Sequence, residues 1–184
     1  MKNGFAGTIG NLIPLLDENG EPKFSSFLWY RVPLFDYTSA DEDLVFNFNG
    51  VQYTMDRHFD TDGGSIPPVL RIIPFAHLNP FNFPRAYFFH DCAYQYGGLY
   101  IKYENDEKPL FRLMTRKQVD ILLKELLPYD GATWYDRFII NTGIYLGSWA
   151  VWNTVRKPAL QKEQRKLNKI DVYSEEGELI ESNK

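Results

Sequence analysis

The chain has 184 residues, of which 44% are hydrophobic and 16% aromatic, and such a chain can bury one substantial core. This composition argues against global disorder, and the net charge of −4 argues against a broad basic surface for nucleic acid. The single cysteine, Cys92, excludes an internal disulfide framework. Residues 1–20 hold no apolar run long enough for a secretory signal, so we expect no secretion by that route.

The N-terminal half has the patterns of a small antiparallel sheet. Residues 1–26 are rich in Gly, Pro and Asn, and we expect them to form an irregular arm. The aromatic run FLWYRVPLF, residues 27–35, predicts a short strand. Residues 44–55 predict a hairpin, because Asn49-Gly50 lies between two alternating runs and a type I′ turn needs positive φ at both central positions.

The C-terminal half has the patterns of helices. Residues 85–95 predict a helix that ends before a pair of glycines. Thr115, followed by Gln118 three residues later, predicts a capping box at the start of a helix over residues 115–127. An apolar stripe runs along that helix, and Pro128 is expected to follow its end.

Residues 138–155 carry no charged side chain and are flanked by Arg137 and Arg156. The segment reaches the lower length limit of a membrane span, but Asn and Thr dilute it. We therefore expect a buried helix, with interfacial membrane contact as the alternative and a transmembrane span disfavoured. Residues 157–184 are basic first and then acidic, which predicts a polar tail that is solvated or partner-bound and of low order.

Together these patterns predict an α+β fold in which a small antiparallel sheet packs with a helical half. The expected organisation is an arm over residues 1–26, one globular domain over 27–156 and a charged tail over 157–184.

A polar group interrupts the apolar stretch FFHDCAYQYGG, residues 88–98. In a helix, His90 and Tyr94 lie one turn apart on one face, and Asp91 points about 100° away. Asp120 flanks the apolar stripe of the second helix, so it can accept a hydrogen bond from His90 if the helices pack antiparallel. That bond would raise the basicity of the other ring nitrogen, as a general base requires.

In this scheme Asp91 can bind a hard cation, together with backbone oxygens from a glycine-rich loop. The loop Asp62-Gly63-Gly64-Ser65 is the candidate supplier of those oxygens. A structural interpretation stands beside the functional one. A histidine in an apolar helix is often only a hydrogen-bonded core residue, and Asp and Ser in turns commonly bond their own backbone.

The segments FDTDGGSIPP, HDCAY and TRKQVD, taken in order, resemble a family of mostly phage-encoded domains of unknown function. The family's pattern is F-x-x-D-x-x-S-I-P, then H-D-x-x-Y, then an Arg followed by a helical Asp. The matching positions are Phe59, Asp62, Ser65, Ile66, Pro67, His90, Asp91, Tyr94, Arg116 and Asp120. The resemblance covers about residues 53–152. It implies a phage-encoded protein located in the host cytoplasm or the virion.

H-D-x-x-Y on a helix, with an Asp on a second helix, also looks like the core of calcium-dependent phospholipases of the type A-two class. This resemblance implies that His90 activates water, Asp91 binds calcium as a cofactor, Asp120 orients the histidine and Tyr94 is a supporting donor. The chain departs from that class in two respects. It lacks the disulfides of the secreted members, and DTDGGS is not a calcium loop of the usual Y-G-x-x-x-G kind.

The leading hypothesis is a hydrolase of esters or phospholipids, with Arg116 and the loop of residues 62–65 on the substrate side. One alternative is a metal phosphohydrolase of the HD type, because His58, His90-Asp91 and Asp120 follow its ligand order. The other is a virion component or host-factor-binding protein in which the polar group only joins two helices. The expected partners are phage structural proteins or a lipid or ester substrate.

Overall fold

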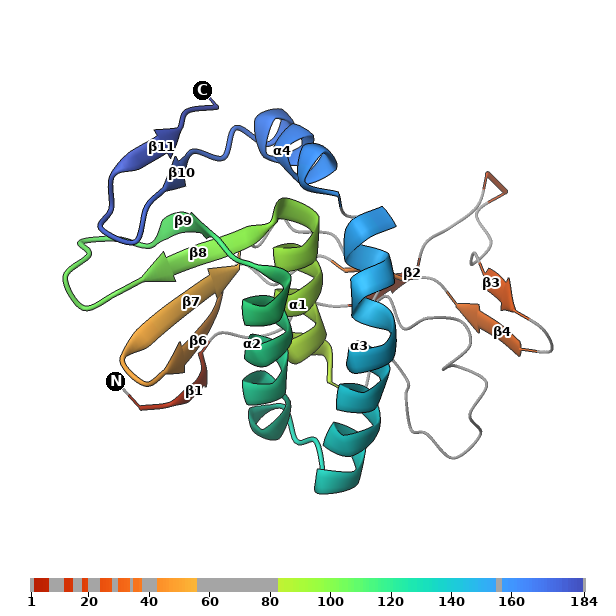
Figure 1. Ribbon diagram of the computed structural model, residues 1–184. Helices are drawn as coiled ribbons and strands as arrows, with labels where there is room; N and C mark the ends of the chain where they lie inside the picture. The colour runs from red at the N-terminus through yellow and green to blue at the C-terminus, as the bar shows by residue number, and fades with distance from the viewer. Residues whose placement is uncertain are drawn as a thin grey trace.

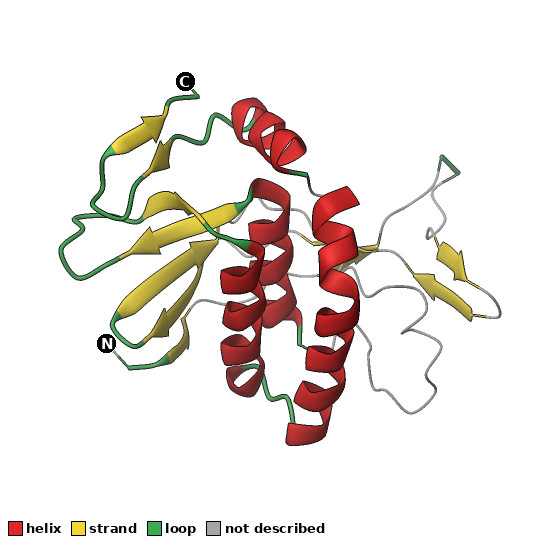
Figure 2. Cartoon of the chain, in the orientation of Figure 1, coloured by secondary structure: helices red, strands yellow, loops and turns green. Residues whose placement is uncertain are grey.

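A computed structural model describes residues 2–6, 12–14, 18–19, 24–27, 30–33, 35–37, 43–55, 83–154 and 157–183. Within these residues, one seven-stranded sheet lies beside a group of helices (Figures 1 and 2). Its strands, in spatial order, are β1 (Gly4–Ala6), β6 (Leu44–Phe48), β7 (Val51–Met55), β8 (Gly98–Lys102), β9 (Leu110–Leu113), β10 (Val172–Tyr173) and β11 (Leu179–Glu181). Neighbouring strands pair antiparallel except β9 and β10, which are parallel.

The described helices are α1 (Pro84–Tyr96), α2 (Arg116–Tyr129), α3 (Trp134–Thr154) and α4 (Pro158–Leu167). The short strands β2 (Leu12–Pro14) and β5 (Phe35–Tyr37) pair with each other, as do β3 (Phe24–Phe27) and β4 (Tyr30–Pro33). The predicted α+β class is confirmed. The sheet is larger than the sequence indicated, because β8 to β11 are added from the C-terminal half.

The predicted hairpin is present as β6 and β7. Asn49 and Gly50 form its turn with φ of 49° and 81°, the positive values that a type I′ turn requires. Phe46 opposes Tyr53 and Leu44 opposes Met55, so these side chains share one face of the sheet. That face is the core face, since most of these side chains are fully buried.

The local signals at the helix ends are also confirmed. Helix α1 ends at Gly97, whose φ of 73° is left-handed and whose N–H donates to the Ala93 carbonyl. Helix α2 begins with the capping box of Thr115 and Gln118. Its predicted end was wrong, because α2 continues through Pro128 to Tyr129. Pro128 has no N–H to donate to the Lys124 carbonyl one turn earlier, so the helix loses one hydrogen bond just before its end.

The main core lies between the sheet and helices α1 and α2. Helix α1 is the central element, since it contacts β7, β8, α2 and α4. Each large apolar side chain buried there contributes about 1.5–3 kcal/mol relative to exposure. The largest fully buried side chains of this core are Phe46, Phe88, Phe89, Leu44, Met55, Leu99, Leu123, Leu126, Leu127 and Val119.

Helix α3 includes the uncharged segment that was expected to be a buried helix. Ile140 and Gly143 are buried, whereas Phe138 and Tyr145 are 64% and 85% exposed. The expectation of burial therefore holds for one face only. No described helix has the length and apolar character to cross a membrane.

Where the structure describes the predicted irregular arm and low-order tail, both contain regular elements. Residues 4–6 form β1 and pair with β6, and the run of residues 27–35 is divided among β3, β4 and β5 rather than forming one strand. Residues 157–183 fold as α4, β10 and β11 instead of a loose tail. Their order has a physical cause, because the buried Gln161 and Arg165 side chains donate to backbone carbonyls at the end of α1.

Arg112 on β9 joins the C-terminal strands to the sheet. Its buried guanidinium pairs with Asp106 at 2.9 Å and donates to the Ser174 carbonyl at 2.9 Å and to the Ile101 carbonyl. Burial alone would raise the pKa of Asp106, but hydrogen bonds from Arg112 and the Tyr103 N–H lower it below its ordinary value. A buried charge of this kind is stable only because it is fully paired.

Replacing Arg112 should therefore destabilise the protein strongly. We expect Arg112→Met to lower the free energy of unfolding by about 3–5 kcal/mol, because it leaves Asp106 without its cationic partner and the Ser174 and Ile101 carbonyls without their donor. Glu163→Gln, at an exposed position of α4, should change it by less than about 0.5 kcal/mol. Urea unfolding followed by circular dichroism measures both, and a loss below about 1 kcal/mol for Arg112→Met would contradict this interpretation.

Candidate functional site

The polar side chains singled out in the sequence meet where α1 and α2 pack together. The two helices run antiparallel, since Tyr94 near the end of α1 contacts Asp120 near the start of α2 (Figure 1). His90 and Asp91 lie on α1, and Arg116 lies one turn before Asp120 on α2. The structure thus brings together five of the residues that the sequence analysis named.

Asp120 is the centre of this group. Its buried carboxylate accepts a hydrogen bond from the Tyr94 hydroxyl at 2.6 Å on Oδ1 and one from Arg116 Nη1 at 3.1 Å on Oδ2. Hydrogen bonds to a carboxylate are stronger than those between neutral groups, and two donors fix its orientation. Arg116 therefore acts on Asp120, although its side chain is still 34% exposed.

His90 lies between two carboxylates. Its Nε2 is 3.5 Å from Asp120 Oδ1, and its Nδ1 is 3.7 Å from Asp91 Oδ1. The His90 ring also stacks on the Tyr94 ring, with 4.2 Å between the centroids. The side chain is 13% exposed, so the imidazole is largely withdrawn from water but not sealed from it.

These neighbours change the acid strength of His90. Burial alone would lower the pKa of the imidazole, but hydrogen bonds to Asp120 and Asp91, and the charges of both carboxylates, raise it above 6.5 overall. The two carboxylates therefore favour the protonated ring. The neutral ring, which a general base needs, is predominant only at a pH above this raised pKa.

Contacts at both ends of α1 hold His90 and Tyr94 in place. At its start, Asp130 accepts from Arg85 Nε at 2.7 Å and from the Ala86 N–H at 3.0 Å. At its end, Gln161 donates to the Tyr94 carbonyl at 3.0 Å. The sequence analysis missed these residues, because nothing local marks a contact between segments so far apart in the chain.

Trp152 is a further neighbour that the sequence did not assign to the site. Its ring meets the Tyr94 ring edge to face, with 4.8 Å between the centroids. Helix α3 thereby covers the Tyr94 side of the group. Aromatic content near the end of α3 was visible in the sequence, but its partner was not.

The remaining predicted site residues cannot be placed. Asp62, Gly63, Gly64, Ser65 and also His58, of the alternative metal scheme, lie outside the described residues. Within the described part of the chain, no three His, Cys, Asp or Glu side chains are grouped so that they could hold a metal ion. Calcium binding by Asp91 accordingly stays a prediction, and the chemistry derived below uses no metal.

Comparisons of this chain with protein-family models, with curated proteins and with solved structures found no match. Both resemblances drawn from the sequence motifs therefore stay predictions. The chemistry of the site rests on its geometry.

The raised pKa of His90 should make the free energy of unfolding depend on pH. Protonation of His90 stabilises the folded state, because the pKa of His90 is higher in the folded chain than its unfolded value of 6.5. This stabilisation is complete below pH 6.5 and is lost as the pH rises through the folded pKa. The free energy of unfolding of the wild type should therefore exceed that of His90→Asn more at about pH 6 than at about pH 9. Urea titrations across this range measure the difference, and a gap that widens with pH would contradict the predicted direction.

Proposed function

We propose that the protein is a hydrolase of ester bonds in which His90 is the general base and Asp120 its positioning partner. One observation carries the proposal. The imidazole, 13% exposed, is largely withdrawn from solvent beside a carboxylate that Tyr94 and Arg116 already hold in a fixed orientation. A base oriented by a second, fixed group is the arrangement that activates water in hydrolases.

The proposed reaction begins with neutral His90. With Nε2–H directed to Asp120, the lone pair of Nδ1 accepts a proton from a water molecule. The water oxygen attacks the carbonyl carbon of the ester as that proton leaves. When the tetrahedral intermediate collapses, the bond to the alcohol oxygen breaks and the His90 proton passes to that oxygen. Asp91 Oδ1, 3.7 Å from Nδ1, can accept the second hydrogen of the same water and so orient it.

Each neighbour has a separate part in this scheme. Asp120 stabilises the positive charge that His90 acquires in the transition state. Tyr94 and Arg116 are positioning residues, because both act through the Asp120 carboxylate. The loop of residues 62–65 stays the predicted substrate side. Because the pKa of His90 is raised, turnover should increase with pH up to that pKa and then level off.

A second candidate function needs no catalysis. The Tyr94 and Asp120 side chains are buried between two helices, and such a network can serve simply to join them. In that case the protein would be a phage virion component or would bind a host factor, as the first sequence resemblance allows. The metal phosphohydrolase alternative receives no support from the described residues, since its first ligand, His58, lies outside them.

The test of the hydrolase proposal is turnover of soluble and lipid esters, with and without added calcium. His90→Asn should lower kcat by about 10²–10⁴-fold, the usual contribution of a general base. Tyr94→Phe, which keeps the ring but removes the donor to Asp120, should lower it by about 10–100-fold. Glu163→Gln, on the exposed side of α4, is the matched control and should retain full turnover.

Assays should be run at several pH values between about 6 and 9, and thermal unfolding at each pH should confirm that each variant is folded. If the folded wild type hydrolyses no member of a broad ester and phospholipid panel, the hydrolase proposal fails. If it does hydrolyse one and His90→Asn is equally active, His90 is not the base.

A further inference from the structure

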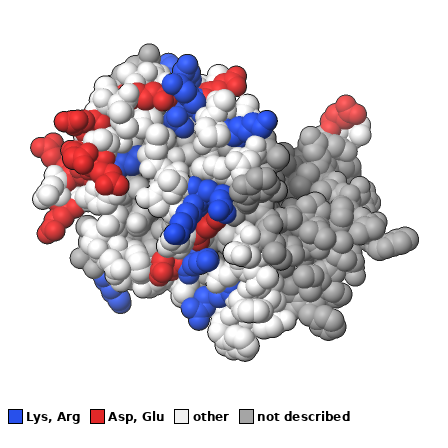
Figure 3. Space-filling model, in the orientation of Figure 1, with Lys and Arg blue, Asp and Glu red and all other residues white. Residues whose placement is uncertain are grey.

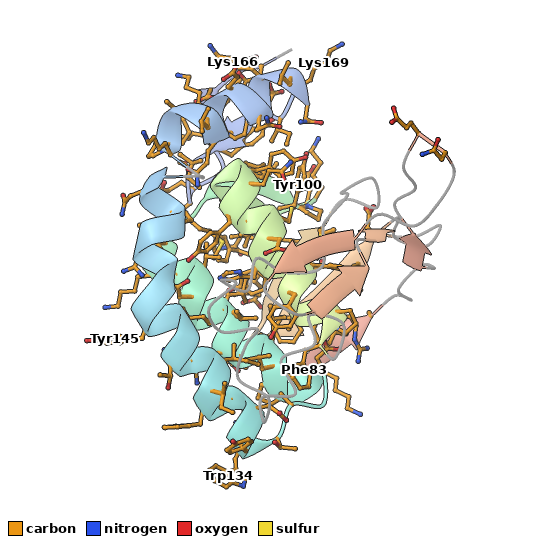
Figure 4. All side chains as sticks on the ribbon, turned by 90° about the vertical axis from the view of Figure 1, so that its right-hand side faces the viewer. Phe83, Tyr100, Trp134, Tyr145, Lys166 and Lys169 are labelled. Carbon is orange, nitrogen blue, oxygen red and sulfur yellow. The ribbon has the colours of Figure 1, made fainter. Side chains whose placement is uncertain are left out.

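Helix α3 carries an exposed aromatic stripe, which we define as Trp134, Phe138 and Tyr145. Their exposed fractions are 73%, 64% and 85%. At 100° per residue these three positions lie within about 40° of each other around the helix, so they form one line along its outer face. Figure 4 shows the Trp134 and Tyr145 side chains pointing away from the body of the protein. Large aromatic side chains aligned in this way mark an interaction surface.

The sequence around the stripe is unusual for a solvent-exposed helix. From Phe138 to Thr154, α3 has no charged residue, so the polar side chains of this segment, such as the exposed Thr142 and Asn153, are all neutral. Arg137 and Lys157 stand at either side of this uncharged segment. Trp and Tyr side chains are enriched at membrane–water interfaces, and the aromatic stripe offers one of each to such an interface.

Helix α2 adds positive charge beside the stripe. Lys117, Ile121 and Lys124 are exposed and follow the i, i+4, i+7 spacing that places them on one outward line. Helices α2 and α3 are in contact, so this line and the aromatic stripe belong to neighbouring helices. In Figure 3, blue Lys and Arg atoms lie over the part of the surface formed by α2 (Figure 1), with some red Asp and Glu atoms between them.

The acidic side chains of α2 and α3 are less exposed than Lys117 and Lys124. Asp120 is buried against Arg116, and Asp136 is held in the cap of α3 by Thr133. Glu125 is half-buried. The exposed charges on this face are therefore those of Lys117 and Lys124, although the chain as a whole has a net charge of −4.

We propose that the outer face of α2 and α3 binds the surface of an anionic phospholipid membrane. The aromatic stripe would enter the headgroup region, where Trp and Tyr are favoured, and the two lysines would face the anionic lipids. A second copy of the chain is the competing occupant of this apolar face, and light scattering on the same samples distinguishes it from a membrane.

This proposal does not depend on the hydrolase proposal, because it concerns the outer surface of α2 and α3. The two are nevertheless connected in space through α2, which carries Asp120 toward α1 and the lysines toward solvent. A membrane bound at this face would bring ester bonds close to the helix that positions His90.

The experiment is sedimentation of the full chain with vesicles of phosphatidylcholine, with and without phosphatidylglycerol. The wild type should bind the mixed vesicles more tightly than pure phosphatidylcholine. Near an anionic surface each lysine contributes about fivefold to the partition coefficient, so replacing Lys117 and Lys124 together by alanine should lower it roughly 25-fold. The triple variant Trp134→Ala, Phe138→Ala, Tyr145→Ala should lose binding to both kinds of vesicle.

The matched control replaces Lys166 and Lys169 by alanine. These exposed lysines lie at the opposite end of the molecule from Trp134 (Figure 4), so their loss should change the partition coefficient by less than about twofold. An equal loss from both lysine pairs would mean general electrostatic attraction and would overturn the proposal. The proposal would also fail if the chain bound no vesicles, or if light scattering showed a dimer for the wild type and a monomer for the triple aromatic variant.

Two further measurements separate this proposal from the hydrolase proposal. His90→Asn should bind the mixed vesicles as well as the wild type does, because His90 lies inside the α1–α2 contact. The triple aromatic variant should hydrolyse a soluble ester at the wild-type rate. If the chain binds vesicles but hydrolyses no ester, the membrane proposal holds and the hydrolase proposal fails. If the chain hydrolyses an ester but binds no vesicles, the membrane proposal fails.

Discussion

The carboxylate of Asp120 is the group on which the arrangement of α1 and α2 depends. It is buried, so its charge is tolerated only because Tyr94 and Arg116 donate to it and His90 lies beside it. Tyr94 and His90 come from α1, and Arg116 comes from the same helix as Asp120. One carboxylate thus fixes how two helices meet and sets the ionisation of the histidine between them.

The rest of the structure holds α1 in the position that this contact requires. Asp130, just after α2, accepts from the first turn of α1, and Gln161 of α4 donates to the Tyr94 carbonyl near its last turn. Residues at both ends of α1 are therefore tied to other helices. This explains why the C-terminal segment is folded, since α4 satisfies carbonyls that the end of α1 would otherwise expose.

The sequence predicted the features that depend on near neighbours. The Asn49-Gly50 turn, the Thr115–Gln118 capping box and the glycine end of α1 follow from local geometry, and all three are confirmed. The shared face of His90 and Tyr94 is likewise a property of helical spacing, and their contact with Asp120 needed only the additional guess that the helices pack antiparallel.

The sequence could not predict contacts between distant segments. No neighbouring residue in the chain indicates that Gln161 donates to the end of α1. Likewise, none indicates that Arg112 donates to the turn after β10. The exposure of Phe138 and Tyr145 was missed for a related reason. An uncharged helix is ambiguous between a buried element and one that presents an apolar face outward, and only packing decides.

Helix α2 takes part in both proposals, although neither depends on the other. If Asp120 fixes and charges the imidazole, the same helix α2 can present its opposite side to a membrane without disturbing that contact. If Asp120 does not act on His90, the α1–α2 contact is only structural. Membrane binding by the surface of α2 and α3 would then serve some purpose other than hydrolysis at His90.

The most direct measurement is a titration of the His90 imidazole by NMR in the wild type and in Asp120→Asn, with the signal assigned by its absence in His90→Asn. We expect a pKa above 6.5 in the wild type, because the two carboxylates raise the pKa of His90 by more than burial lowers it. Removing the charge of Asp120 should lower this pKa. A wild-type pKa at or below 6.5, or the same pKa in both proteins, would contradict the central role of Asp120.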